Sequence, residues 1–327
     1  MPEATPVHTR ALGTSAAEIA EGGRLLAAGC LVAFPTETVY GLGADATNPA
    51  AIASLYAAKG RPSFNPLIAH VAHVEDAFAL GDFPPSARKL AEAFWPGALT
   101  LVVPVSENSP VCELARAGLA SIAIRVPDHP VATALIKAAG SPIAAPSANR
   151  SGHVSPSTAA HVHADLDGII EAVLDGGPTR IGVESTILGC LDDTVVMLRP
   201  GGIAREAIET ILGTPLAEGK GDEAAPLAPG RLTSHYAPRQ VLRLDAQGIQ
   251  PGEACLAFGL PLPAGATPAL TLNLSERGDV AEAAANLYQH LRALDAMDAQ
   301  GIAVADFPRR GLGEAIHDRL MRAAAPR

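Results

Sequence analysis

The chain has 327 residues, which leaves room for about two domains with separate hydrophobic cores. Its composition, 48% hydrophobic and 18% charged, excludes general disorder, and its apolar runs are far shorter than the ~20 residues that cross a bilayer. The formal net charge of −10 argues against a general nucleic-acid-binding protein, so any bound anion has to be held by a local group of cations.

The first residues carry acid and proline without the apolar run of a secretory signal, so we expect a cytoplasmic location and no membrane association. Neither a disulfide framework nor a metal site is expected. His161 and His163 stand at i and i+2, which on a helix point to nearly opposite sides. The cysteines lie far apart in apolar stretches with no CxxC pair, which favours free thiols at Cys30, Cys112, Cys190 and Cys255.

In chain order, the apolar pattern predicts an α/β layer fold. A helix begins near Thr14 or Ser15 and ends at Gly29, a strand follows at 31–34, and a second helix opens at Pro49 and ends at Gly60. Helices are also expected near 86–95, 130–139 and 203–212. Between them, short strands are expected within 66–71, 98–104, 121–127, 141–146, 168–175, 184–188 and 194–200.

Residues 213–238 mix glycine, proline and charge without apolar periodicity, which predicts a linker between a first domain, 1–212, and a second domain, 239–327. A connection of this length is often functional. The second domain is expected to be a smaller α/β unit with strands at 241–244, 253–258 and 301–307. One face of its long helix is formed by Ala284, Leu287, Tyr288, Leu291 and Leu294.

The segment 34–46, FPTETVYGLGADA, contains the spacing GxGxxA at Gly41, Gly43 and Ala46. A Rossmann dinucleotide site needs the first glycine directly after the strand and an acid ~20 residues later. Position 61 is an arginine, so a turn is the better interpretation and nicotinamide binding is not expected. The P-loop, HExxH and GxSxG motifs are also missing from the sequence.

Two cations, Lys59 and Arg61, stand on a short loop stiffened by prolines, with Asn65 and His70 close behind. Such a pair either holds phosphates through charge-assisted hydrogen bonds or lies on a solvated loop, and the stiffness favours a binding site. Arg125 interrupts an apolar strand, where a cation is costly unless it is paired. It must therefore meet a carboxylate, either from the protein or from a ligand.

Other polar side chains come directly after strands, where open α/β sheets place their ligands. They lie in the segments PSANRSGHVSP, GVESTIL and MLRPGG and include Ser147, Asn149, Ser155, Ser185 and Arg199. A hydrogen-bonded turn is the competing interpretation for the first segment. Within the linker, HYAP brings two aromatic rings, His235 and Tyr236, to a stretch otherwise short of anchors.

The ordered set FPTETVYGLG, KGRPxxNPLIxH, IRVPxH, PSANxSGxxSP, ESTI, LRPG and HYAP closely resembles the threonylcarbamoyl-AMP synthase family of the YrdC type. The resemblance covers about residues 15–212, and the linker with the second domain resembles the long branch of that family. It implies a YrdC-like twisted mixed α/β sheet domain with a large cleft and a smaller Rossmann-like α/β C-terminal domain. The implied activity is an adenylyl transfer that condenses L-threonine, bicarbonate or CO2 and ATP into threonylcarbamoyl-AMP and pyrophosphate, for N6-threonylcarbamoyladenosine in tRNA.

Carried over to this sequence, the resemblance implies an L-threonine site with Arg125 on the substrate carboxylate; its residues would be Thr38, His70, Arg125, Ala145 and Ser185. Catalysis would rest on positioning and on charge stabilisation by Lys59 and Arg61. The ATP site would comprise Lys59, Arg61, Asn65, Ser121, Ser147, Asn149, Ser155, Arg199 and Tyr236. The linker would fold over the active site, with Tyr236 above the nucleotide, while the wording PGRLTSHYAP leaves contacts of residues 231–234 open.

No run of carboxylates forms a metal cage in the sequence, so Mg2+ would arrive with ATP. The product would pass to the tRNA threonylcarbamoyl transferase machinery, and stable nucleic-acid binding is not expected. The alternative is a YrdC-like RNA-binding module without synthase activity, against which the negative net charge weighs. A carbamoyltransferase sharing this cleft would carry zinc-finger and acylphosphatase-like segments, and this chain has neither.

Overall fold

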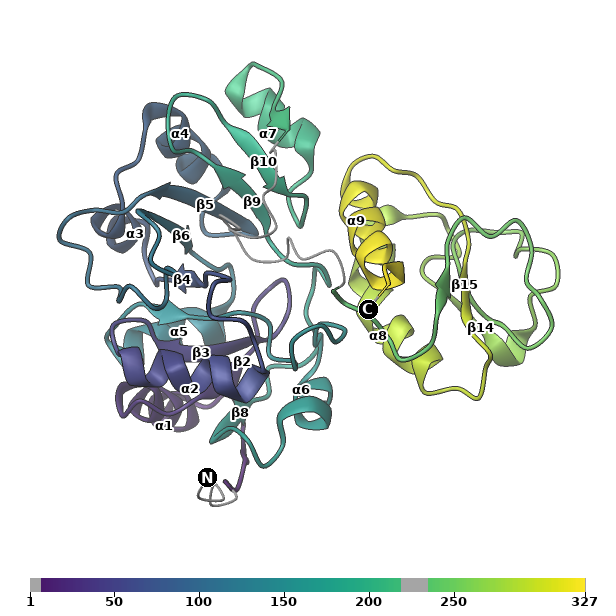
Figure 1. The fold of residues 1–327 in the computed structure, drawn as a ribbon, viewed down its shortest axis with the longest axis horizontal. Coiled ribbons are helices and arrows are strands. Elements are labelled where there is room, and N and C mark those ends of the chain that lie inside the picture. Colours follow the sequence, from purple (N-terminus) through teal and green to yellow (C-terminus); the bar gives the residue numbers. More distant parts are fainter. Residues whose placement is uncertain (1–6, 219–234, 327) are drawn as a thin grey trace.

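The structure, a computed structural model, describes residues 7–218 and 235–326. These residues form two α/β domains that stand side by side (Figure 1). The helices α8 (Val280–Asp295) and α9 (Leu312–Ala324) lie on the side of the second domain that faces the first. None of the described helices combines the length and apolar character that a membrane crossing needs.

The described part of the first domain is built on one mixed sheet, as the sequence predicts, with parallel and antiparallel neighbours. The strands are short, and helices follow or precede most of them. Other elements cover the side chains of the strands. In spatial order, the strands are β1 (Arg10–Leu12), β8 (Ala172–Leu174), β2 (Val32–Phe34), β3 (Gly41–Asp45), β7 (Ile143–Ala144), β4 (Ile68–His70), β6 (Ser121–Arg125), β5 (Leu99–Pro104), β9 (Thr186–Gly189), β10 (Val196–Arg199) and β11 (Ala217–Glu218).

Capping residues explain boundaries of two helices in this domain. Ser15 caps α1 and forms a capping box with Glu18. Asn48 caps α2, and Gly60 ends it with a left-handed backbone, φ +59°. The helices are α1 (Ala16–Ala27), α2 (Pro49–Lys59), α3 (Val74–Leu80), α4 (Pro85–Phe94), α5 (Pro130–Ala139), α6 (Ala159–Leu166) and α7 (Arg205–Leu212).

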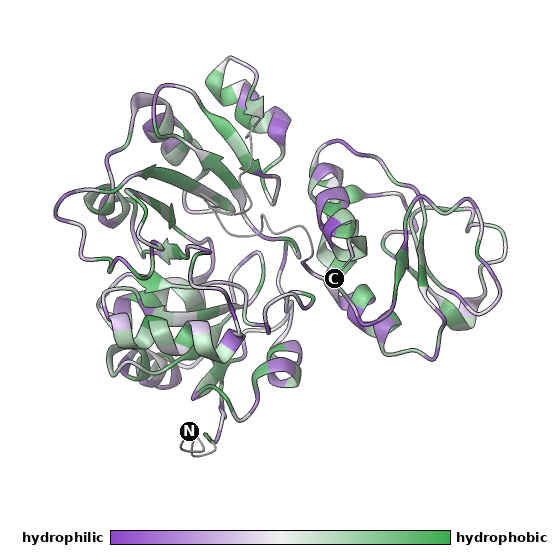
Figure 2. Cartoon of the chain, in the orientation of Figure 1, coloured by the Kyte–Doolittle hydropathy of each residue, from purple (hydrophilic) through white to green (hydrophobic). Residues whose placement is uncertain are grey.

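Helices cover both faces of the sheet. Along β2, Val32 and Phe34 pack with α1 and α5, whereas Ala33 packs into the cluster that includes α2 and α4. This split follows from the two-residue period of a strand, which sends alternate side chains to opposite faces. Apolar colour accordingly follows the strands, while polar colour lies on the outer sides of the helices (Figure 2).

The second domain has a parallel four-stranded sheet in its described part, in the order β12 (Leu242–Arg243), β15 (Ile302–Val304), β13 (Ala254–Ala257) and β14 (Thr271–Asn273). A short 3-10 turn, η1 (Pro268–Leu270), precedes β14. The predicted apolar face of α8 is confirmed: Leu287, Leu291 and Leu294 are fully buried in the second core. Helix α9 completes this core and was not predicted.

Two segments differ from the sequence interpretation. The glycine segment predicted as a turn bends only before Gly41; Gly41–Asp45 is strand β3, antiparallel to β2. A Cβ at Gly43 would stand 3.0 Å from the ring of Phe34 and from the carbonyl oxygen of Val32, so glycine serves close packing there. Strand β11, within the range predicted as linker, pairs with β10 and extends the first sheet.

The contact between α1 and α5 gives a stability prediction. A Cβ at Gly23 would stand 2.5 Å from the Cβ of Ala138, so Gly23→Ala should lower the free energy of unfolding by about 1–3 kcal/mol through overpacking. The matched control is Gly22→Ala, whose Cβ would have side-chain carbons of Leu135 and Leu174 as its nearest neighbours, at 3.0 Å or more. Denaturant unfolding of both variants checks this; equal stabilities would contradict the close helix contact.

Candidate functional site

A small cavity of about 50 Å³ lies at the strand ends of the first sheet, against the segment that leads into the second domain. It brings together much of the predicted site: Arg61, His70, Arg125, Ala145, Ser147, Ser185, Arg199 and Tyr236. It is also lined by Val39, Ile68, Pro146, Glu184 and His235. The sequence implies a large cleft, but His235 and Tyr236 are themselves buried in it and leave little free space.

Sheet register places the two central side chains. The strands β4 and β6 are parallel neighbours, and His70 pairs with Arg125 at their carboxyl ends. Since parallel strands end at the same edge, both side chains reach the cavity together. The Nδ1 of His70 lies 3.0 Å from the carbonyl oxygen of Ile68, which can only accept, so a neutral ring carries its proton on Nδ1. Burial lowers the pKa of His70 to about 3.

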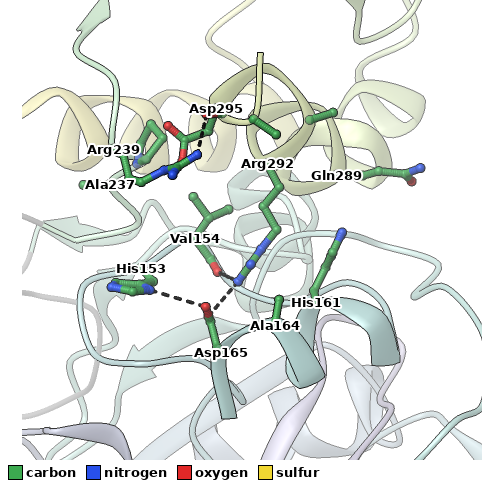
Figure 3. A pocket seen from close by; sticks show the side chains of 13 residues that line it. His153, Val154, His161, Ala164, Asp165, Ala237, Arg239, Gln289, Arg292 and Asp295 are labelled. Carbon is green, nitrogen blue, oxygen red and sulfur yellow. Dashed lines mark hydrogen bonds and ion pairs between the residues drawn. The ribbon is translucent and has the colours of Figure 1, made fainter. Parts of the chain in front are cut away.

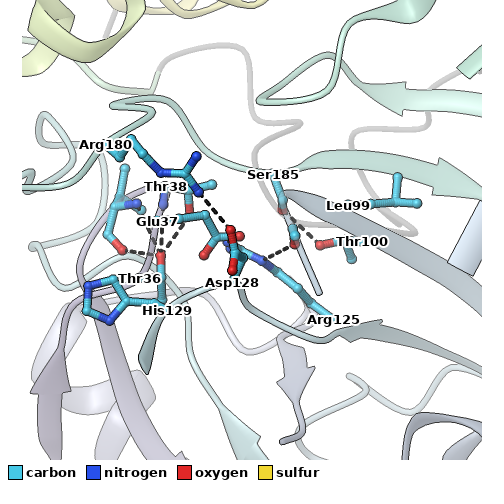
Figure 4. A network of polar contacts seen from close by, with 12 residues as sticks. Thr36, Glu37, Thr38, Leu99, Thr100, Arg125, Asp128, His129, Arg180 and Ser185 are labelled. Carbon is cyan, nitrogen blue, oxygen red and sulfur yellow. Dashed lines mark hydrogen bonds and ion pairs between the residues drawn. The ribbon is translucent and has the colours of Figure 1, made fainter. Parts of the chain in front are cut away.

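The carboxylate that meets Arg125 in this structure comes from the protein. Glu37 Oε1 lies 2.8 Å from Arg125 Nη2, and both side chains are at least 95% buried (Figure 4). Burial would raise the pKa of Glu37, but the adjacent guanidinium outweighs burial and holds it below its usual value. The sequence analysis did not select this acid as a site residue. A ligand carboxylate on Arg125 would therefore share the guanidinium with Glu37.

A second group of polar contacts surrounds Ser185, just before and within β9. Its hydroxyl lies 2.8 Å from the hydroxyl of Thr100 on β5, the parallel neighbour of β9 (Figure 4). Arg199, at the end of β10, donates from Nη2 to the Ser185 carbonyl at 2.9 Å and to its hydroxyl at 3.2 Å. Three neighbouring strands thus hold this serine and this arginine in fixed relation.

The two predicted catalytic cations take different positions. Arg61 lines the cavity and donates to the carbonyl oxygens of Asn65 and Pro66, 3.3 and 3.0 Å away. Lys59 lies behind it and donates to the carbonyls of Ser147 and Asn149, both at 2.5 Å. Burial lowers the pKa of both groups, that of Arg61 to about 10. Lys59 therefore fastens the loop that carries Ser147.

The remaining predicted residues do not line the cavity; they are Thr38, Lys59, Asn65, Ser121, Asn149 and Ser155. Thr38 shares a 2.8 Å hydroxyl contact with Thr36. The amide of Asn149 donates to the carbonyls of Arg150 and His153. Ser121 begins β6 while Arg125 ends it, about 13 Å apart at the rise of a strand. An extended ligand could reach both ends, a compact one could not.

Glu184 is the carboxylate that lines the cavity, and the sequence analysis did not select it. It accepts from Ser155 Oγ at 2.6 Å, Tyr288 Oη at 2.8 Å and Arg319 Nε at 2.8 Å. Burial opposes its charge, but Arg319 and Arg199 outweigh burial and lower its pKa to about 2. Its position in ESTI offered a signal, because an acid beside a predicted ligand serine is unusual in a buried strand.

Residues 219–234 of the predicted linker lie outside the described residues, and with them the open contacts of 231–234. The last part of that range is described. The Tyr236 ring stacks on Tyr288 with centroids 5.9 Å apart, and His235 packs edge-on against Tyr236. The backbone N–H of His235 donates to the carbonyl of Arg322 on α9. The HYAP segment is thus held between the cleft and the second domain.

A larger cavity of about 720 Å³ lies between the domains, away from the predicted site (Figure 3). Asp165 on α6 is approached there by Arg292 from α8 at 2.9 Å and by His153 at 3.4 Å. Its wall includes His161 but not His163. Within residues 7–218 and 235–326, no group of three His, Cys, Asp or Glu side chains could hold a metal ion.

The small cavity carries the chemistry of an anion site. Three buried guanidinium groups, Arg61, Arg125 and Arg199, surround it in a chain whose formal net charge is −10. Planar guanidinium forks bind carboxylates and phosphates in preference to other groups. Fold and site together define a two-domain α/β protein whose arginine-lined cavity is covered by the segment that leads into the second domain.

Comparisons with known proteins agree with this class. Residues 24–201 match the family model described as "Telomere recombination", and residues 203–325 match "Threonylcarbamoyl-AMP synthase, C-terminal domain". The chain is 44% identical to a threonylcarbamoyl-AMP synthase of Bacillus subtilis, over 98% of this chain and 96% of the relative. It is 41% identical to a Pyrococcus abyssi protein of the same name, over 91% and 92%.

A solved structure extends the likeness to three dimensions. The crystal structure of Pyrococcus abyssi Sua5 complexed with L-threonine aligns with a TM-score of 0.88 at 36% identity, covering 97% of this chain and 98% of that one. The chain belongs to the threonylcarbamoyl-AMP synthase family, a family of adenylyl-transferring enzymes, and has its two-domain form.

The buried histidines of the cleft predict a pH dependence of stability. Burial lowers the pKa of His70 and of His235 to about 3, whereas an unfolded histidine titrates near pH 6.5. The unfolded chain therefore binds more protons between those values, so stability should fall as the pH is lowered from about 6.5. Each ring should contribute a slope of about 1.4 kcal/mol per pH unit in denaturant unfolding.

The matched variants are His70→Gln, which removes one buried ring, and His153→Gln, which replaces an exposed one. The slope between pH 6.5 and 5 should become shallower in the first variant and stay unchanged in the second. Identical slopes would show that His70 does not stay neutral in the folded protein.

Proposed function

We propose that the small cavity is the place where this chain condenses L-threonine, bicarbonate or CO2 and ATP into threonylcarbamoyl-AMP, with release of pyrophosphate. The observation that carries the proposal is the convergence of Arg61, Arg125 and Arg199 on one cavity. One carboxylate and a chain of phosphates need this number and kind of cation. The family membership and the threonine complex of the Pyrococcus relative support the same substrates.

The threonine half of the site is assigned to the edge formed by β4 and β6. Arg125 would bind the substrate carboxylate beside Glu37, and the Nε2 lone pair of His70 would accept a hydrogen bond from the substrate hydroxyl or amine. Ser185 offers a hydroxyl that already points to Thr100. Thr38 and the backbone at Ala145, whose N–H donates to the carbonyl of Ile68, would complete the wall.

The ATP half is assigned to the cations and hydroxyls on the other side of the cavity. Arg61 and Arg199 would bind the phosphates, with Tyr236 against the nucleotide. Lys59 would act through the loop it fastens, since its ammonium already donates to two carbonyls. The remaining candidate contacts are those of Asn65, Ser121, Ser147, Asn149 and Ser155.

The chemistry takes two bond-forming steps. The unprotonated amine of threonine attacks CO2, derived from bicarbonate, and loses a proton to give a carbamate. A carbamate oxygen then attacks the α-phosphorus of ATP, and the bond to the bridging oxygen breaks as pyrophosphate leaves. Guanidinium groups beside the phosphates stabilise the charge that develops there, while the arginine on the carboxylate holds the amine in place.

Magnesium would be held by ATP rather than by side chains of the protein. The carboxylates beside the cavity, Glu37 and Glu184, are each engaged by an arginine, so the described residues do not provide a protein cage for a divalent cation. Mg2+ would be carried by the phosphates of ATP and would neutralise part of their charge. Neither step of the proposed reaction uses a metal ion bound by the protein.

Room is needed before ATP can bind. Ligand sites for molecules of that size measure roughly 300–1,000 Å³, whereas this cavity measures about 50 Å³. His235 and Tyr236 fill the space above the arginines, so these two side chains must withdraw on nucleotide entry. The described conformation is therefore a closed form of the cleft.

Pyrophosphate release tests the reaction. We expect release only when ATP, L-threonine and bicarbonate are all present, and loss of at least about 100-fold in kcat/KM for threonine in Arg125→Met, because the substrate carboxylate loses its charged partner. Glu37→Gln in the same chain avoids leaving an unpaired buried carboxylate. The control, Arg180→Met, breaks an exposed ion pair with Asp128. Threonine-independent release would contradict the proposal.

Arg61 gives a second test. Arg61→Met should lower kcat by about 100-fold and affect the melting temperature less, since the guanidinium stabilises phosphate charge while its loss only removes one donor from two carbonyl oxygens. Single-turnover kinetics and thermal unfolding measure the two effects separately. A large loss of melting temperature without loss of turnover would assign Arg61 a structural role only.

The rival RNA-binding function has a clear signature. Phosphate contacts make RNA binding steeply salt-dependent. Tight, salt-dependent binding of tRNA without pyrophosphate release would favour the binding module. Synthesis without stable tRNA binding would favour transfer of the product to the tRNA threonylcarbamoyl transferase machinery. A cytoplasmic location is expected from the sequence.

A further inference from the structure

We infer that the C-terminal domain takes part in shaping the cleft. Its residues Tyr288 and Arg319 would hold the ATP side of the cavity in place through their contacts with Glu184. The inference rests on the proposed function, because it names the residues that arrange the ATP half. Neither Tyr288 nor Arg319 lines the cavity. They are positioning residues, which act on the site through another side chain.

Glu184 joins the two domains at a single carboxylate. From the first domain it accepts the hydroxyl of Ser155, a candidate ATP contact. From the second it accepts the hydroxyl of Tyr288 on α8 and the Nε of Arg319 on α9. All four side chains are buried, so each donor is held where solvent competes little. A shift of α8 or α9 would therefore move Glu184, which precedes Ser185 in the chain.

Arg319 also fixes the aromatic cover of the cavity. Its side chain is fully buried, and its guanidinium carbon lies 5.2 Å from the ring centre of Tyr236. Asp318 balances part of its charge through a 2.5 Å ion pair. The same guanidinium therefore contacts Glu184, which lines the cavity floor, and Tyr236, which covers the cavity. Tyr236 is further held by stacking on Tyr288.

The charges continue to the arginine proposed for phosphate. Arg199 lies close enough to Glu184 for its charge to help lower the Glu184 pKa, and it donates to the carbonyl of Ser185. Loss of a donor from the second domain would leave Glu184 under-satisfied in a buried site. The carboxylate would then turn toward Arg199 and Ser155, and both are groups that ATP needs. The threonine edge at Arg125 has its own counter-charge, Glu37, so this change reaches the threonine side only through Ser185.

One other contact between the domains lacks this link to the cavity. Arg205 on α7 pairs with Glu314 on α9 at 2.5 Å, at a partly exposed part of the seam. Glu314→Gln weakens this pair and so weakens docking without touching Glu184. Tyr288→Phe removes one hydroxyl and keeps the ring that stacks on Tyr236. Comparing the two variants separates docking in general from positioning through Glu184.

The experiment measures KM for ATP and for L-threonine by pyrophosphate release in the full chain, together with ATP affinity by calorimetry. In Tyr288→Phe we expect KM and Kd for ATP to rise about 10-fold, the loss expected for a hydrogen bond to a buried charge, with a smaller rise in KM for threonine. Glu314→Gln should leave all three unchanged. Arg319→Lys, which keeps the charge but not the fork, should raise KM for ATP more than Tyr288→Phe does.

Equal constants for Tyr288→Phe and wild type would overturn the inference, and so would matching effects of Tyr288→Phe and Glu314→Gln. Failure of the proposed function is recognised separately, in wild type. Binding of ATP without threonine-dependent pyrophosphate release would refute the synthase proposal, and the variants' ATP affinities would still decide the positioning role. A wild-type chain that binds no ATP would refute both.

Discussion

Burying three guanidinium groups beside one small cavity is the constraint on which the rest of this structure depends. A charge removed from water needs partners, and each arginine meets this need differently. Arg125 has the Glu37 carboxylate, Arg61 has two loop carbonyls, and Arg199 has the carbonyl and hydroxyl of Ser185. The carbonyls that meet Arg61 carry no counter-charge, whereas the Glu184 carboxylate lies close enough to Arg199 to interact with its charge.

The loops are shaped by the need to supply these partners. The backbone after β10 passes so close to Glu184 and Ser185 that a Cβ at Gly201 would stand 2.4 Å from their main-chain atoms. Close approach is what glycine permits. It lets Arg199 turn back onto Ser185. Lys59, at the end of α2, holds the loop after β7 in place by donating to two of its carbonyls. The motif residues that look like binding groups are thus partly the framework of the site.

Much of the fold could be predicted because its signals are local. Caps and prolines marked the ends of α1 and α2, and apolar runs marked the buried strands. Strand β3 could not be predicted from its glycines, since their reason is the ring of Phe34 on the neighbouring strand. The same holds for the site. Arg125 required a carboxylate, but only the fold shows that Glu37 supplies it.

The role of Glu184 was even harder to predict from the sequence. Its donors come from residues 155, 288 and 319, which no spacing in the sequence connects. Helix α9, which carries one of them, was itself not predicted. Sequence patterns identified most of the cavity wall because motif residues are close along the chain. They did not identify what holds the wall in place, because those contacts cross between domains.

The small volume of the closed cavity has a chemical consequence. A carbamate joined to AMP is a mixed anhydride, which water cleaves readily. A closed cavity of about 50 Å³ is too small to hold this product, so His235 and Tyr236 can return to their described positions only after the product has left. Closing of the cleft would therefore leave the product in bulk water, where its decay starts. The lifetime of the product would then be set by the distance to its next acceptor rather than by the enzyme that made it.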